Sequence, residues 1–135
     1  MSTAYVVTAL VTAAANTFSG VAAITRFAPV MRTLRPALRK AGVPESWLVF
    51  PIGIPKAMGA LGLVLGLLGV PLVGTAAAAG LILYFVCALY THLRVYDFAP
   101  QFYLAAVFLG LAVATLALDP TLVLNTANSA TLLTQ

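Results

Sequence analysis

The chain has few of the residues from which soluble enzymes build their active sites. Its 135 residues include one cysteine, one histidine and three acidic residues, and only 7% are charged. A typical soluble domain has about 25% charged residues. The single cysteine, Cys87, excludes a disulfide framework and a cysteine-based metal site, and we expect no metal site of another kind.

Catalytic motifs are also absent from the sequence. It has no GxSxG or HExxH motif, no phosphate-binding loop and no pair of carboxylates within an apolar segment. Any catalysis would therefore depend on Lys56, His92, Asp97 or a bound cofactor. The net charge is +4, but no basic face with interleaved aromatic residues is present, so we expect no nucleic-acid partner.

Apolar residues dominate the chain instead. They make up 62% of it, and the mean hydropathy is +1.06. A domain of this size cannot hide so much apolar surface from water. The composition therefore predicts an integral membrane protein whose helices contact the lipid bilayer.

Four segments are long enough to cross a membrane, which takes about 20 mainly apolar residues. They span about residues 3–25, 47–70, 72–90 and 101–118. Their short connections predict an all-α, four-helix bundle with up-down topology in residues 1–118. Residues 119–135 are too few and too polar to span again, so we expect an exposed tail that is partly ordered or lies at the interface.

The connection between the first two spans is predicted to be a loop, because Pro29, Pro36 and Pro44 are expected to break a helix there. Loops rich in Lys and Arg face the cytoplasm. Apart from Lys56, all basic residues fall in the first and third loops, so both termini are expected on the non-cytoplasmic side. These basic residues are Arg26, Arg32, Arg35, Arg39, Lys40 and Arg94. No basic residue precedes Arg26, which disfavours a cleaved signal peptide.

Lys56 is the most unusual residue, because it falls either within the second span or at its entrance. Its depth depends on whether Pro51 and Pro55 lie inside the helix or before it. A charged side chain inside a span is costly and is by default a functional candidate. Lys56 could instead extend its ammonium group to the interface, or pair with Asp97 or Glu45.

His92 is the second candidate and lies at the end of the third span. Asp97 follows closely, and Tyr84 lies on the same helix face as His92. A histidine at this place could shuttle protons or ligate haem. Capping of the helix C-terminus is the favoured explanation, and haem binding is not expected.

Aromatic residues surround the same loop. Tyr103 and its neighbours could stack on a flat ligand such as a quinone, although an aromatic belt at the headgroup level explains most of them without a ligand. The candidate ligand-binding residues are Lys56, Tyr84, His92, Asp97 and Tyr103.

Small residues recur along the second span at spacings that allow helices to approach closely. The partner could be a helix of the same chain or of a second copy. In the first span, Asn16 and Ser19 are expected to form hydrogen bonds between helices. The recurring small residues are Gly59, Gly62, Gly66 and Gly69.

Two stretches carry a family resemblance. PKAMGALG, at residues 55–62, opens the second span, and ALYTHLR, at residues 88–94, closes the third. Together with four short spans and a basic first loop, they make the chain similar to the DoxX-like membrane proteins over about residues 3–118. The resemblance implies a four-helix bundle in the bacterial cytoplasmic membrane.

The positions that match the family's motif are Lys56, Gly59 and His92. Many relatives place an acidic residue shortly after the Gly-Ala pair of the second span, where this chain has Leu61 and Gly62. The missing acid removes a partner for Lys56 and weakens the transfer of an activity.

The resemblance also implies a class of function. Some members are linked to thiosulfate:quinone oxidoreductase or to redox protection complexes, and an animal relative assists receptor assembly. We therefore expect an accessory or assembly subunit of a membrane complex. Its partner would be another protein or a second copy of the chain, and a link to redox chemistry is one version of this expectation. The alternative is an oxidoreductase subunit that binds a quinone or another apolar ligand, and a channel or transporter ranks last.

Overall fold

The computed structural model describes residues 1–134, and all regular secondary structure in them is helical. This confirms the all-α prediction, although six helices are present where four were expected. The helices are α1 (Thr3–Ile24), α2 (Ala28–Ala41), α3 (Ile54–Leu67), α4 (Val73–Arg94), α5 (Pro100–Ala117) and α6 (Pro120–Leu133).

Four segments are long and apolar enough to cross a membrane, as predicted. They are Thr3–Ile24, Glu45–Leu67, Val73–Arg94 and Pro100–Ala117. Their helices form one bundle, in which α1 and α4 each pack against both α3 and α5. The length and composition of these segments identify an integral membrane protein.

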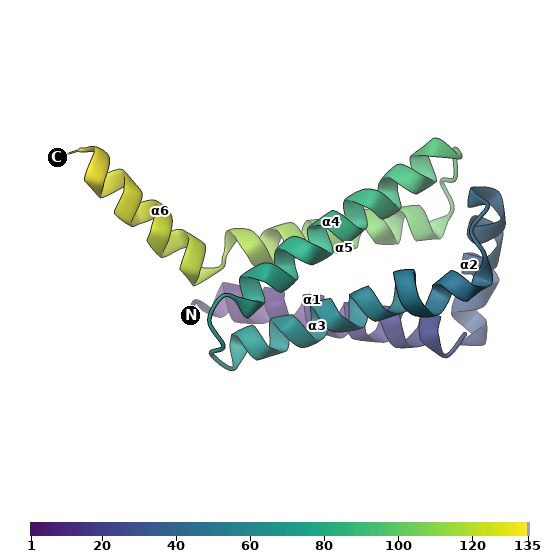
Figure 1. Ribbon diagram of the computed structural model, residues 1–135, viewed down its shortest axis with the longest axis horizontal. Coiled ribbons are helices and arrows are strands. Elements are labelled where there is room, and N and C mark those ends of the chain that lie inside the picture. The colour runs from purple at the N-terminus through teal and green to yellow at the C-terminus, as the bar shows by residue number, and fades with distance from the viewer. Residues whose placement is uncertain (135) are drawn as a thin grey trace.

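Helices α3 and α4 approach closely at one end of the bundle and diverge toward the other, where α2 lies across the end (Figure 1). Glycines of α3 allow this close approach, because a side chain at their positions would clash with α4. A Cβ added to Gly66 would lie 2.5 Å from the Cα of Gly74, and one added to Gly62 would lie 2.6 Å from the Cβ of Ala77. Gly59 faces the Leu81 side chain in the same way. The glycines of α3 therefore pack against α4 of the same chain.

Gly69 does not belong to this stripe, contrary to expectation. It lies in the turn after α3 with a φ of 92°, and a Cβ there would meet nothing within 4 Å. Glycine adopts this left-handed conformation without a steric penalty. Gly69 is therefore required by the turn and does not take part in helix packing.

The first connection is a helix, α2, and the prediction of a loop was wrong. Pro29 lies in the first turn, where a missing N–H costs nothing, and Pro44 follows the helix. Gly42 ends α2 in a left-handed conformation, and Val43 N donates to Leu38 O over 2.9 Å. Only Pro36 lies inside the helix.

Burial of one apolar face explains why α2 forms despite its prolines. Met31 and Leu38 are 2% and 6% exposed and pack with Ala23 and Leu48. Their seven-residue separation, with Leu34 between them, is the amphipathic spacing of a surface helix. This spacing is the sequence signal that could have identified α2.

The second span continues through both of its prolines. A 3₁₀ turn, Glu45–Leu48, leads into a π turn, Val49–Gly53, in which Ile54 N donates to Val49 O. Pro51 has no N–H to donate to the preceding turn, and the altered hydrogen-bond pattern of a π turn tolerates this without ending the helix. Lys56 is consequently the midpoint of Glu45–Leu67 and lies deep in the span.

Polar side chains inside the bundle bond mainly within their own helices. Thr12 and Thr115 form the one hydroxyl pair between α1 and α5 that we find in residues 1–134, at 3.0 Å. Asn16, expected to bond between helices, donates to Thr12 O of its own helix over 2.9 Å. Its buried Oδ1 has no partner in the described chain.

The tail forms an ordered helix, α6, that projects from the bundle (Figure 1). Residues 122–134 are all exposed. Asp119, 3% exposed, caps α6 and accepts hydrogen bonds from Thr75 Oγ1 at 2.6 Å and Thr121 N at 2.9 Å. Burial alone would raise the pKa of Asp119, but hydrogen bonds from Thr121 and Thr75 outweigh it and hold the pKa below its ordinary value.

Candidate functional site

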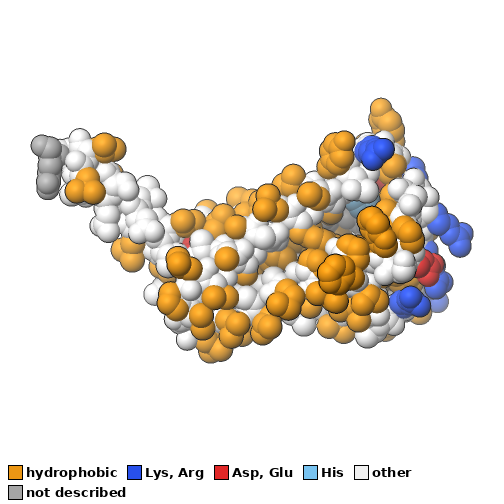
Figure 2. Space-filling model, viewed as in Figure 1, with side chains coloured by type: hydrophobic (Ala, Val, Ile, Leu, Met, Phe, Trp, Pro, Cys, Tyr) orange, Lys and Arg blue, Asp and Glu red, His pale blue; other side chains and the backbone are white. Residues whose placement is uncertain are grey.

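A cavity of about 630 Å³ lies between α2 and the diverging ends of the spans. Figure 2 shows the surface hollowed on this side of the bundle, toward the end where Lys and Arg side chains gather. All four spans and α2 contribute to its wall. Its polar lining residues include Ser19, Thr33, Lys56, Tyr84, Thr91, His92 and Gln101, and its larger apolar ones include Phe18, Leu34, Trp47, Ile52, Phe85 and Phe108.

Lys56 supplies a positive charge to this cavity. Its Nζ donates to Ser19 Oγ at 2.9 Å and lies 5.7 Å and 5.9 Å from the ring centroids of Tyr84 and Phe85. In residues 1–134, no carboxylate lies within ion-pair distance of it. The ammonium group is thus held inside the bundle by a hydroxyl and two aromatic rings, and it keeps further donors for a ligand.

Tyr84 is oriented by the irregular start of the second span. Its hydroxyl donates to Ile52 O at 3.3 Å, and its ring lies edge-on to Phe85 with centroids 5.0 Å apart. The carbonyl of Ile52 belongs to the π turn, where the ordinary helical bonding is interrupted. The turn that admits the prolines therefore also positions a cavity side chain.

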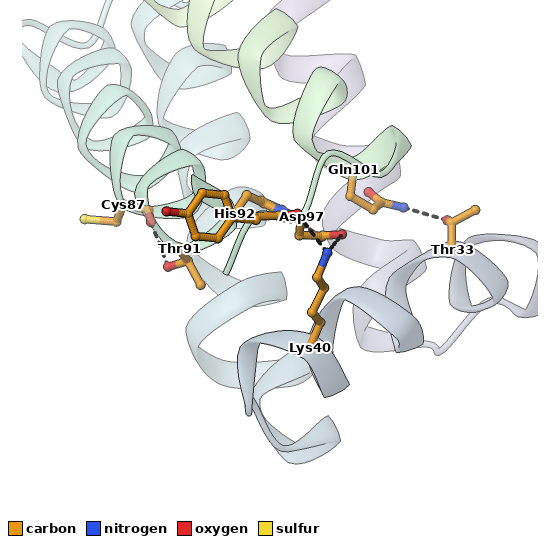
Figure 3. A network of polar contacts seen from close by, with 8 residues as sticks. Thr33, Lys40, Cys87, Thr91, His92, Asp97 and Gln101 are labelled. Carbon is orange, nitrogen blue, oxygen red and sulfur yellow. Dashed lines mark hydrogen bonds and ion pairs between the residues drawn. The ribbon is translucent and has the colours of Figure 1, made fainter. Parts of the chain in front are cut away.

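His92 and Asp97 form a pair. His92 Nδ1 and Asp97 Oδ2 are 2.8 Å apart, and Asp97 is only 6% exposed. Lys40 of α2 joins them, with Nζ 3.9 Å from Asp97 Oδ1 and 2.8 Å from Tyr96 O (Figure 3). Asp97 is therefore bound to α2 and does not line the cavity, whereas His92 does.

A second polar contact ties α2 to the bundle. Gln101 Nε2 donates to Thr33 Oγ1 at 2.6 Å, joining α5 to α2 (Figure 3). Thr33, Lys40 and Gln101 were not among the residues singled out from the sequence. Thr33 and Lys40 lie on α2, a helix that was not expected from the sequence. Gln101 of α5 could not be paired with Thr33 without that helix.

Tyr103 is not brought to the cavity. It is 60% exposed, and its ring lies edge-on to Phe102 with centroids 5.4 Å apart. Tyr90 and Tyr96 are also turned outward, at 65% and 79% exposed. Their positions near one end of the spans agree with the aromatic belt that the sequence offered as an alternative.

Residues 1–134 hold no group of three or more His, Cys, Asp and Glu side chains that could bind a metal ion. The chemistry that this arrangement can perform is recognition of an apolar molecule. Aromatic and aliphatic walls would surround its body, while Lys56, Tyr84 and His92 could address its polar atoms.

The model of the DoxX-like family matches residues 7–115. This range contains α2, the second and third spans, most of the first and fourth, and both sequence stretches on which the resemblance was based, so the resemblance is confirmed. Searches of curated proteins and of solved structures returned no match.

Proposed function

We propose that this chain, which belongs to the DoxX-like family of membrane proteins, binds a small amphiphilic molecule in the cavity beneath α2. One observation carries the proposal: Lys56, at the middle of a span, faces an apolar cavity of about 630 Å³ without a carboxylate partner among the described residues. Binding sites for small molecules commonly enclose about 300–1,000 Å³ and have few polar groups. A charged side chain inside a span is costly, and such residues commonly mark functional sites.

The proposed ligand has an apolar body and an oxygen-bearing head. The ammonium group of Lys56 would donate to a carbonyl or carboxylate oxygen, with Ser19 fixing its direction. A ring or chain would contact Phe18, Trp47 and Phe108. A quinone has this chemistry, and a redox-linked role would follow if a quinone is the natural ligand.

The orientation in the membrane is part of the proposal. We place α2 and its arginines on the cytoplasmic side of a bacterial cytoplasmic membrane, with residues 1–118 crossing up and down and both termini outside. The gathering of Lys and Arg at one end of the molecule supports this orientation (Figure 2).

Cys87 provides the test of ligand binding. It is the only cysteine, it lines the cavity and it is exposed. Decylbenzoquinone and decanoic acid, used separately as probes on the purified full chain, are expected to slow alkylation of Cys87 by N-ethylmaleimide. Protection by either probe supports the proposal, and protection by the quinone alone supports the redox link.

A cavity-filling variant and its control make the test specific. Ala88→Trp adds a large side chain to the lining and should abolish protection, because the ring would occupy the ligand volume. Ala76→Trp adds the same side chain to an exposed position of α4 outside the lining and should leave protection unchanged. Equal protection in both variants would contradict a ligand in this cavity.

A second candidate function is that of an accessory or assembly subunit, and α6 favours it. This helix has no buried residues, and it exposes Leu124, Leu132 and Leu133 at 64%, 74% and 88%. Apolar side chains presented on a projecting helix are typical of a contact with a protein partner or a second copy.

Removal of residues 120–135 tests this second function. The full chain is expected to run in native gels of mildly solubilised membranes as a larger assembly, and the shortened chain at the size of the bundle alone. Co-purification of two differently tagged copies would identify a second copy as the partner. Unchanged migration of the shortened chain would exclude α6 as the assembly contact.

A further inference from the structure

A second concave region lies on the face of α2 that bears its arginines, and we call it the arginine hollow. It has a volume of about 350 Å³. Arg32, Arg35 and Arg39 come from α2, and Arg26 comes from the turn that precedes it. The proposed ligand cavity does not include any of these four residues, so the two regions are separate.

The positive charge of the hollow is largely uncompensated. Arg35 Nε lies 3.0 Å from Glu45 Oε1. No ion pair involves Arg26, Arg32 or Arg39 in residues 1–134. A guanidinium group stays protonated at any physiological pH. The hollow therefore presents several cations to an incoming anion.

The backbone explains how the arginines converge. Arg32, Arg35 and Arg39 are spaced by three and four residues, which places them on one side of α2. Arg26 has a φ of 53°, and this left-handed residue turns the chain from α1 into α2. Met31 and Leu38 meanwhile hold the helix to the bundle.

The position of α2 selects the kind of anion. The helix lies across the ends of the spans (Figure 1), which is the level of lipid headgroups in a bilayer. Phe27, 48% exposed, directly follows Arg26 in the chain and can contact acyl chains. A free anion in water would gain nothing from this apolar side chain, whereas a lipid brings acyl chains to it.

We propose that the arginine hollow binds the phosphodiester headgroup of an anionic lipid. Arginine donates two parallel hydrogen bonds to phosphate oxygens, a geometry that lysine cannot match. The lipid would anchor α2, and with it the roof of the cavity, to one leaflet. This inference is independent of the identity, or even the existence, of a ligand in the cavity.

Native mass spectrometry of the delipidated full chain in detergent tests the proposal. Dioleoylphosphatidylglycerol is expected to bind at least about tenfold more tightly than dioleoylphosphatidylcholine, which carries no net charge. Arg32→Gln and Arg39→Gln should each weaken phosphatidylglycerol binding about tenfold, because each removes a charged donor. Arg32→Lys should restore part of the affinity.

Arg94→Gln is the matched control. It removes the same charge from the C-terminal turn of α4, outside the hollow. Its phosphatidylglycerol affinity should equal that of the unaltered chain. Equal loss in Arg94→Gln, equal binding of phosphatidylcholine, or displacement of the lipid by millimolar inorganic phosphate would each overturn the proposal. Circular dichroism of every variant shows whether the helices have formed.

Discussion

Replacement of Gly66 by alanine is expected to destabilise the bundle by about 1–3 kcal/mol, the range for overpacking a close contact. The added Cβ would lie 2.5 Å from Gly74 Cα and 2.8 Å from Gly74 N. Both are backbone atoms, so no side-chain rotation can relieve the contact. Helices α3 and α4 would have to separate at the end of the bundle where they are closest.

Two other glycines serve as controls for this prediction. A Cβ at Gly110 in α5 would meet nothing within 4 Å, so Gly110→Ala should cost nothing and, by its helix preference, can gain up to about 1 kcal/mol. Gly59→Ala would meet the Leu81 side chain, which can move, and should have an intermediate effect. Unfolding in mixed micelles by titration with sodium dodecyl sulfate measures all three. A stability loss in Gly110→Ala as large as in Gly66→Ala would refute the packing argument.

Lys56→Met is expected to lower the affinity of the cavity for decanoic acid by about 10–100-fold. Hydrogen bonds to a charged group contribute about 1.5–3 kcal/mol, and tenfold in affinity corresponds to about 1.4 kcal/mol. Methionine keeps the apolar stem of lysine and removes only the ammonium group. Protection of Cys87 from alkylation, measured over a range of decanoic acid concentrations, gives the affinity.

The stability of the same variant separates a ligand role from a structural role. Lys56 has no carboxylate partner among residues 1–134, so its replacement leaves no buried charge unpaired and should not destabilise the bundle. Arg94→Gln, which removes the same charge outside the cavity, should bind decanoic acid normally. A Lys56→Met protein with normal affinity but lower stability would show that Lys56 only supports the fold.

The spans could be predicted closely because each is a long apolar run that ends at polar residues or proline. The first was expected at 3–25 and is Thr3–Ile24, and the fourth was expected at 101–118 and is Pro100–Ala117. The third continues to Arg94 beyond the predicted end at residue 90. His92 and Arg94 do not stop it, because basic side chains are favourable at the C-terminus of a helix, and Thr91 Oγ1 donates to Cys87 O within the helix.

The candidate site was only partly predictable. Lys56, Tyr84 and His92 were singled out and do line one cavity, since a polar side chain in an apolar helix turns toward other protein groups. Asp97 was one of two acids considered as a partner for Lys56, and it pairs with His92 and Lys40 instead. The contact with Lys40 depends on the position of α2, a helix that the sequence analysis did not predict because of its prolines.

The sequence by itself determined that this protein is helical, enters the membrane through four segments and belongs to the DoxX-like family. These properties follow from composition and short-range spacing, which act within one helix. The tertiary structure alone decided that α3 and α4 meet at Gly66 and Gly74 and diverge beyond them. It also decided that α2 covers the space between them and that Lys56 faces this space without a carboxylate partner among the described residues. Contacts between segments far apart in the chain set these features, and no local pattern encodes them.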